Sequence, residues 1–94
     1  MYDQEIKNRV KISVAAFAYE YLNSPIMSDA DFDSLAQQIN ITKQTGNKTL
    51  DTFFEKYFTP DSGVWIHKHP EKNKLEYLYK EYYHEQYNIK DKRY

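Results

Sequence analysis

Apolar residues recur with helical spacing in four stretches of this chain. In residues 3–22 the apolar positions lie three and four residues apart, which places them on one face of an α-helix. These positions are Ile6, Val10, Val14, Phe17, Ala18 and Tyr21. Because proline cannot continue the helical hydrogen bonds, Pro25 predicts that this first helix ends near Leu22.

Two further stretches predict shorter helices in the middle of the chain. Ser28 is a favoured N-cap residue for the second helix. The apolar stripe of this helix consists of Phe32, Leu35, Ala36 and Ile39. After a polar run in which Gly46 suits a left-handed turn, a third helix is expected to begin near Asn47 or Thr49. Its apolar residues are Leu50, Phe53, Phe54, Tyr57 and Phe58.

The last third of the chain predicts a turn, a short apolar loop and a longer helix. Residues 59–63 carry proline and glycine in turn positions. The run Val64–Ile66 is too short for a helix, so we expect a loop that places Trp65 in the core, with extended geometry as one option. A fourth helix is expected from near Pro70 to about Asn88, before a frayed tail over residues 90–94. The inner face of this helix consists of Leu75, Leu78, Tyr79 and Tyr82.

Together these elements predict an all-α fold of about four helices in a single domain over residues 1–94.

The composition excludes several classes of function. The chain has 94 residues and no cysteine, which excludes disulfide scaffolds, thiolate metal sites and cysteine nucleophiles. A net charge of −1 provides no overall attraction to nucleic acid or to an anionic membrane. Because no apolar run has the length of a signal peptide or membrane helix, we expect a cytoplasmic protein without a membrane partner.

The most specific local motif runs from Tyr19 to Leu35, where a helix ends in aromatic residues, turns through Pro25 and restarts at Ser28. This motif resembles the N-terminal helical domain (domain Ia) of NAD-dependent DNA ligases. The ligase pattern is Tyr-(Tyr/His)-x-x-(Asp/Asn)-x-Pro-x-(Ile/Val)-(Ser/Pro)-Asp-x-(Glu/Asp)-Tyr-Asp-x-Leu. The resemblance covers residues 10–39 and implies that the first two helices form a hairpin like that of domain Ia.

In those ligases the motif binds the nicotinamide mononucleotide half of NAD. The resemblance implies that Tyr19 stacks on the cationic nicotinamide ring, while Asp29 and Asp33 bind ribose hydroxyls and complement the positive charge. Two residues depart from the pattern: Glu20 replaces a His or Tyr, and Phe32 replaces a Tyr. The adenylation motif Lys-x-Asp-Gly is absent, and 94 residues cannot hold the catalytic domain, so the chain is not expected to be a ligase or another enzyme.

The same residues also suit a hairpin without a ligand. Ser28 then serves as an ordinary cap, Asp29 and Asp33 decorate the start of a helix, and Phe32 belongs to the core. The sequence leaves both interpretations open. It also leaves open whether the loop that carries Trp65 covers the ligase-like patch.

The second half of the chain predicts contacts with another protein. Residues 51–76 resemble small stand-alone ligase-domain-related proteins of bacteria and their phages, whose function the resemblance does not supply. Because five tyrosines between residues 77 and 87 cannot all face one side of a helix, some lie outside the inner stripe, either at an interface or flat on the surface with hydrated hydroxyls. The interface candidates are Tyr77, Tyr83, Tyr87 and Trp65.

We therefore considered two functions. The first is a non-catalytic module that binds another protein or itself, as a regulatory or inhibitory protein of phage or mobile-element type. The alternative is a binder of nicotinamide mononucleotide, NAD or a related nucleotide, with no other cofactor. Nucleic acid is not an expected partner, because glutamates alternate with the lysines of residues 68–85. His67, His69 and His84 lack the spacing of a metal site, so neither a metal site nor a catalytic residue is predicted.

Overall fold

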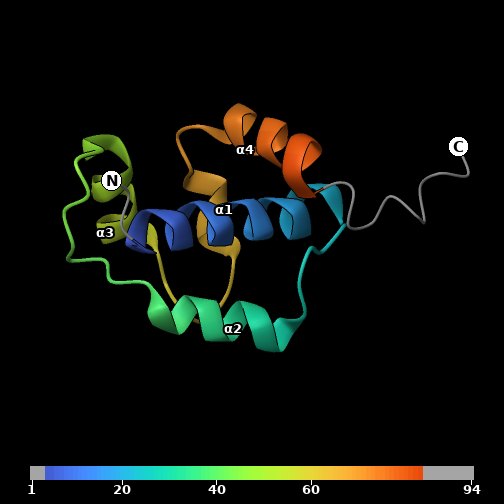
Figure 1. Cartoon of the computed structure of the whole chain (residues 1–94), viewed down its shortest axis with the longest axis horizontal. Coiled ribbons are helices and arrows are strands. Elements are labelled where there is room, and N and C mark those ends of the chain that lie inside the picture. Colours follow the sequence, from blue (N-terminus) through green and yellow to red (C-terminus); the bar gives the residue numbers. More distant parts are fainter. Residues whose placement is uncertain (1–3, 84–94) are drawn as a thin grey trace, which may run out of the picture.

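The computed structural model describes residues 4–83, and in this part of the chain it contains helices and no strand, which confirms the all-α prediction. Helix α1 lies at the centre, with α2 along one side, α4 along the opposite side and α3 beside its N-terminal end (Figure 1). The α-helices are α1 (Gln4–Leu22), α2 (Asp29–Gln38), α3 (Lys48–Tyr57) and α4 (Lys72–Leu78). A 3₁₀ helix, η1 (Val64–Lys68), precedes α4, and a π-helical turn, η2 (Tyr79–Tyr83), follows it.

Helix α1 is more deeply buried than its sequence pattern predicts. Every residue from Ile12 to Ala18 is buried, so the middle of the helix is covered on all sides rather than on one face. Small side chains such as Ala16 allow the neighbouring segments to approach the helix closely. Tyr21, which was expected on the inner face, is instead 40% exposed.

The two middle helices begin where the sequence predicts. Ser28 caps α2, because its hydroxyl accepts a hydrogen bond from the Asp31 backbone amide at 3.1 Å. Asn47 caps α3 in the same way through Leu50. Gly46 has a φ of 96°, a left-handed conformation that favours glycine, so its predicted turn is confirmed.

The aromatic core lies between α3 and η1. The Trp65 ring centroid is 5.6 Å from that of Phe54 and 5.0 Å from that of Phe58. The Trp65 indole N–H donates to the Ser62 carbonyl oxygen at 2.7 Å, so its polar atom is satisfied. Trp65 therefore fills the core as expected, but the loop predicted for Val64–Ile66 is wrong, as is its extended option, because this run forms the first residues of a 3₁₀ helix.

Helix α4 begins at Lys72, two residues later than Pro70. His69 prepares this start, because its Nδ1 accepts a hydrogen bond from the Glu71 backbone amide at 2.9 Å. Tyr79 is buried and its hydroxyl lies 2.8 Å from the Ser24 hydroxyl, which ties η2 to the end of α1. The Tyr82 side chain, the predicted continuation to Asn88 and the tail over residues 90–94 lie outside the described residues.

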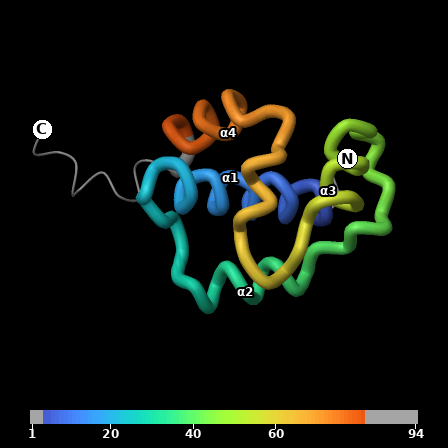
Figure 2. Tube along the Cα trace, turned by 180° about the vertical axis from the view of Figure 1, so that it is seen from behind, coloured from blue at the N-terminus to red at the C-terminus, as the bar shows by residue number. Residues whose placement is uncertain are grey.

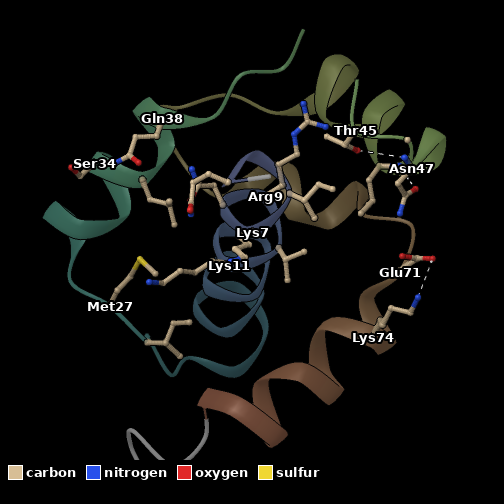
Figure 3. Close-up of a pocket in the computed structure, with 18 of the residues that line it drawn as sticks. Lys7, Arg9, Lys11, Met27, Ser34, Gln38, Thr45, Asn47, Glu71 and Lys74 are labelled. Carbon is tan, nitrogen blue, oxygen red and sulfur yellow. Dashed lines mark hydrogen bonds and ion pairs between the residues drawn. The ribbon is translucent and has the colours of Figure 1, made fainter. Parts of the chain in front are cut away.

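One side of α1 remains open as a wide groove (Figure 3). Helix α2 forms one wall of the groove, while residues 45–50 and the start of α4 form the other. The groove has a volume of about 1710 Å³.

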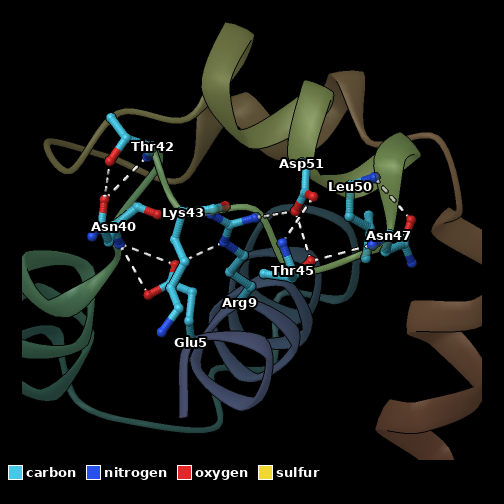
Figure 4. A network of polar contacts seen from close by, with 9 residues as sticks. All are labelled: Glu5, Arg9, Asn40, Thr42, Lys43, Thr45, Asn47, Leu50 and Asp51. Atoms are coloured by element: carbon cyan, nitrogen blue, oxygen red, sulfur yellow. Dashed lines mark hydrogen bonds and ion pairs between the residues drawn. The ribbon is translucent and has the colours of Figure 1, made fainter. Parts of the chain in front are cut away.

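A buried ionic cluster joins α1 to α3 and to the loop between α2 and α3 (Figure 4). The Arg9 guanidinium is 2% exposed and donates to Glu5 Oε2 at 2.7 Å and to Asp51 Oδ1 at 2.8 Å. It also donates to the backbone oxygens of Asn40 at 2.7 Å and Lys43 at 3.0 Å. Because the bonds reach three segments, the cluster holds the loop in place.

The carboxylates of this cluster are also satisfied. Glu5 accepts a hydrogen bond from the Asn40 backbone amide, and Asp51 accepts from both the backbone amide and the hydroxyl of Thr45. Burial alone would raise the pKa of Asp51. The hydrogen bonds from Thr45 and the Arg9 charge outweigh burial and hold this pKa below its ordinary value.

No helix within residues 4–83 combines the length and the apolar character needed to cross a membrane.

Candidate functional site

The residues of the ligase-like motif line a single pocket of about 310 Å³. The pocket lies between the C-terminal half of α1, the turn that follows it and the first half of α2. All five motif residues singled out from the sequence take part, and they are Tyr19, Glu20, Asp29, Phe32 and Asp33. The sequence pattern shows only the order of these residues along the chain. The structure shows that they come from two helices and border one cavity.

Local backbone signals place these side chains. Helix α1 ends at Leu22, and the next residue, Asn23, has a φ of 50° that turns the chain away from the helix axis before Pro25. The cap at Ser28 then starts α2. Because Asp29 and Asp33 are four residues apart on this helix, they share one face, and that face borders the pocket.

The third wall comes from the turn after α3, whose position next to α2 no local sequence pattern predicts. Figure 2 shows this segment, in yellow, reaching down to α2 before it returns across α1. Asp61, Ser62 and Gly63 line the pocket. A Cβ atom at Gly63 would lie 3.3 Å from the Ala16 side chain and 3.6 Å from the Phe32 ring, so glycine permits this close approach. The turn was recognisable from its sequence, but its contact with α2 was not.

The pocket is strongly acidic. Its carboxylates belong to Glu20, Asp29, Asp33 and Asp61, and none of the described residues that line it is basic. Asp29, Asp33 and Asp61 are exposed and form no ion pair with another residue of the described chain. The arrangement favours a positively charged ligand and disfavours an anionic group.

Glu20 has a protein partner that the sequence did not reveal. The His67 ring lies between two α1 side chains, with Nε2 3.1 Å from Glu20 Oε1 and Nδ1 2.9 Å from the Tyr21 hydroxyl. A carboxylate only accepts hydrogen bonds, so Nε2 carries a proton and donates to Glu20. The side chain that departs from the ligase pattern is therefore held at the pocket by η1.

The aromatic residues at the pocket differ in exposure. Tyr19 is 57% exposed at the pocket edge, so its ring face is open to a ligand. Phe32 is half-buried and packs against the core. Trp65 lies in the aromatic core and does not line the pocket, so the loop that carries it leaves the ligase-like patch open.

The predicted interface residues have different outcomes. Trp65 is only 4% exposed, so its assignment to an interface is wrong, because its ring is needed to fill the space between α3 and η1. Tyr77 is 58% exposed and stays a candidate. The Tyr83 side chain and Tyr87 lie outside the described residues.

The two histidines within residues 4–83 face different neighbours. His69 is buried against the Phe53 ring at 4.8 Å, and burial, together with the Lys72 charge, lowers its pKa to about 4. His67 faces Glu20 and Tyr21, and His84 lies outside the described residues. Within residues 4–83, no three acidic or histidine side chains are arranged to hold a metal ion.

No protein-family model matches this chain, and no curated protein or solved structure is significantly similar to it. The resemblance of residues 10–39 to ligase domain Ia therefore stays a prediction that rests on the sequence motif.

Proposed function

We propose that this chain is a non-catalytic binding module whose acidic pocket takes the cationic nicotinamide–ribose end of a nicotinamide nucleoside or nucleotide. One observation carries the proposal: the ligase-like motif residues, which come from two helices, line the same cavity of about 310 Å³.

The chemistry of the pocket suits a pyridinium ring. A cationic heteroaromatic ring is attracted to the electron-rich face of a tyrosine by about 0.5–2 kcal/mol, and the Tyr19 face is open. Asp29 and Asp33 supply negative charge and accept strong hydrogen bonds from ribose hydroxyls. Their shared helix face presents both carboxylates to one ligand.

The charge of the pocket also limits the ligand. No described lining residue can neutralise a phosphate, and Asp61 adds a further negative charge. We therefore expect nicotinamide riboside, which carries no phosphate, to bind at least as tightly as nicotinamide mononucleotide. The volume lies at the lower end of ligand pockets, which span about 300–1,000 Å³, so a nucleoside fits better than a whole dinucleotide.

The two departures from the ligase pattern reduce the contacts available to the ligand. Glu20 is already bonded to His67, and Phe32 has no hydroxyl to offer. Binding therefore depends on Tyr19 and on the aspartates.

Calorimetric titration with nicotinamide riboside, its reduced dihydro form and nicotinamide mononucleotide tests this function. The oxidised riboside should bind with a micromolar Kd, about −8 kcal/mol. The reduced riboside has a similar shape but no positive charge, so it should bind at least about tenfold more weakly. Equal affinity for both forms, or no heat at millimolar oxidised riboside, would contradict the proposal.

A further inference from the structure

The open groove beside α1 is distinct from the acidic pocket. It borders the N-terminal half of α1, whereas the pocket borders the C-terminal half, and the two cavities share only Ile26 and Met27. Figure 3 shows Lys7 and Lys11 on α1 between Ser34 and Gln38 of α2 and Lys74 of α4.

The floor of the groove is apolar but incompletely covered. Its apolar side chains come from α1, the turn before α2, α2 itself and α3. Ile26 is buried, but the others are only half-buried, and these are Ile6, Val10, Met27, Leu35 and Leu50. Covering them would remove further apolar surface from water, which favours association by about 25 cal/mol per Å² before the costs of binding.

The rim of the groove carries more basic than acidic side chains, and its acidic residues are Asp31 on α2 and Glu71. Lys7, Lys11 and Lys48 are exposed and form no ion pair with another residue between 4 and 83. Lys74 is only 3.8 Å from Glu71, a loose pair between exposed groups. Arg9 also borders the groove, but Glu5 and Asp51 neutralise it.

We propose that this groove binds an amphipathic helix of a partner protein, with an apolar stripe flanked by aspartates or glutamates. The stripe would cover the groove floor, in the manner of helix-in-groove recognition. Lys7 and Lys11 lie one helical turn apart on α1, between the two walls, and Lys48 and Lys74 lie on the wall formed by residues 45–50 and the start of α4, so acidic residues beside the stripe would find a lysine. This proposal is independent of the acidic pocket.

Other occupants fit the groove less well. None of the groove-lining residues in the described chain is aromatic, so bases of a single-stranded nucleic acid would find no ring to stack on. Residues 84–94 carry three basic and two acidic side chains, so their net charge has the same sign as the rim. In a second copy, α2 is acidic, but Phe32 and Leu35 pack against its own core, so it has no apolar stripe to offer.

A designed peptide provides the probe. The peptide is fluorescein-labelled, roughly 16 residues long so that a helix can form, with leucines at i, i+3, i+4 and i+7 and glutamates on both sides. A peptide of the same composition with its leucines dispersed around the helix is the matched control. Fluorescence anisotropy should show micromolar binding of the first peptide and at least about tenfold weaker binding of the second.

Matched variants locate the binding. The double variant Lys7→Glu/Lys11→Glu should bind the amphipathic peptide at least about tenfold more weakly than the parent. The control Lys56→Glu/Lys68→Glu, whose residues lie outside the groove, should change the Kd for this peptide less than about twofold. Thermal melts of both variants should match the parent, because the substituted lysines are exposed and make no contribution to the packed core. Methyl chemical shifts should move at Val10, Leu35 and Leu50 and not at Ile66.

Three results would overturn the proposal. Equal affinity for the two peptides would show that charge alone is recognised. Binding of single-stranded oligothymidylate, with no binding of the peptide, would assign the groove to nucleic acid. Concentration-dependent self-association that Lys7→Glu/Lys11→Glu abolishes would assign it to a second copy.

Discussion

Charged side chains gather at two places along α1, and the two groups differ in their partners. In the cluster near the N-terminal end, Arg9 bonds to Glu5, Asp51 and two backbone oxygens, and the three charged side chains are buried. At the pocket near the C-terminal end, Asp29 and Asp33 are exposed and have no ion pair within the described chain.

This difference separates a structural role from a binding role. Charges that are buried and fully hydrogen-bonded hold three segments together, and removing one leaves the others uncompensated. Charges that face an open cavity add little to stability but remain available to a ligand. Substitutions at the two places should therefore affect different measurements.

The largest expected effect follows from Arg9→Met. Loss of the guanidinium leaves Glu5 and Asp51 charged and buried without a cation, which typically costs about 3–5 kcal/mol. Urea unfolding followed by circular dichroism measures the loss. Lys11→Met on the exposed side of the same helix is the control and should change the free energy of unfolding by about 0.5 kcal/mol or less. A similar value for both variants would show that the cluster does not stabilise the fold.

The pH dependence of stability tests a second buried group. Because burial lowers the pKa of His69 from 6.5 to about 4, the unfolded chain binds a proton in this window that the folded chain does not. Stability should therefore be complete above pH 6.5 and fall as the pH drops towards 4.

Thermal melts of His69→Asn check this assignment. Asparagine does not titrate, and its Oδ1 can still accept the Glu71 amide hydrogen bond, so the slope between pH 4 and 6.5 should flatten. The Asp51 pKa is lowered, so its contribution is present above the unfolded value and disappears only as the pH falls below about 4. An unchanged slope in the variant would contradict the role of His69.

At the pocket, the double variant Asp29→Asn/Asp33→Asn should bind nicotinamide riboside at least about tenfold more weakly, because two carboxylates no longer attract the cation. Asp31→Asn is the matched control, since Asp31 lies in the same first turn of α2 but borders the groove instead of the pocket. Calorimetry gives the affinities, and thermal melts should show similar stability for both variants. If Asp31→Asn weakens binding as much, helix-end electrostatics rather than the pocket is responsible.

A smaller effect is expected for Tyr19→Ala, which removes a ring worth about 0.5–2 kcal/mol to a cation, or roughly two- to thirtyfold in Kd. Tyr77→Ala removes a tyrosine of nearly equal exposure, 58% against 57%, that does not line the pocket. The Kd of Tyr77→Ala for nicotinamide riboside should equal that of the parent protein. Equal losses in the two variants would argue against stacking on Tyr19.

The sequence predicted those features that depend on neighbouring residues. Helix starts at Ser28 and Asn47 and the left-handed turn at Gly46 follow from local hydrogen bonding and backbone freedom, and each was confirmed. The motif also identified the pocket residues of α1 and α2, because both helices belong to one continuous stretch of sequence.

Features that depend on distant contacts were not predicted. Arg9 and Asp51 are 42 positions apart, and no local pattern marks them as partners. The wall formed by Asp61 to Gly63 and the bond between His67 and Glu20 likewise arise only when the segment after α3 returns across α1. The sequence suits Trp65 to the core and to an interface alike, and its packing between α3 and η1 shows that it belongs to the core.

The central claim is that the pocket aspartates, which form no ion pair within residues 4–83, mark the ligand site. An NMR titration of the isotope-labelled protein with nicotinamide riboside tests it most directly. Backbone amide shifts should move at Ala16, Tyr19 and Asp33, and at Ser62 and Gly63 across the pocket, while the groove residues Lys7 and Leu50 stay unchanged. Shifts confined to the groove, or no shifts at millimolar riboside, would contradict the account.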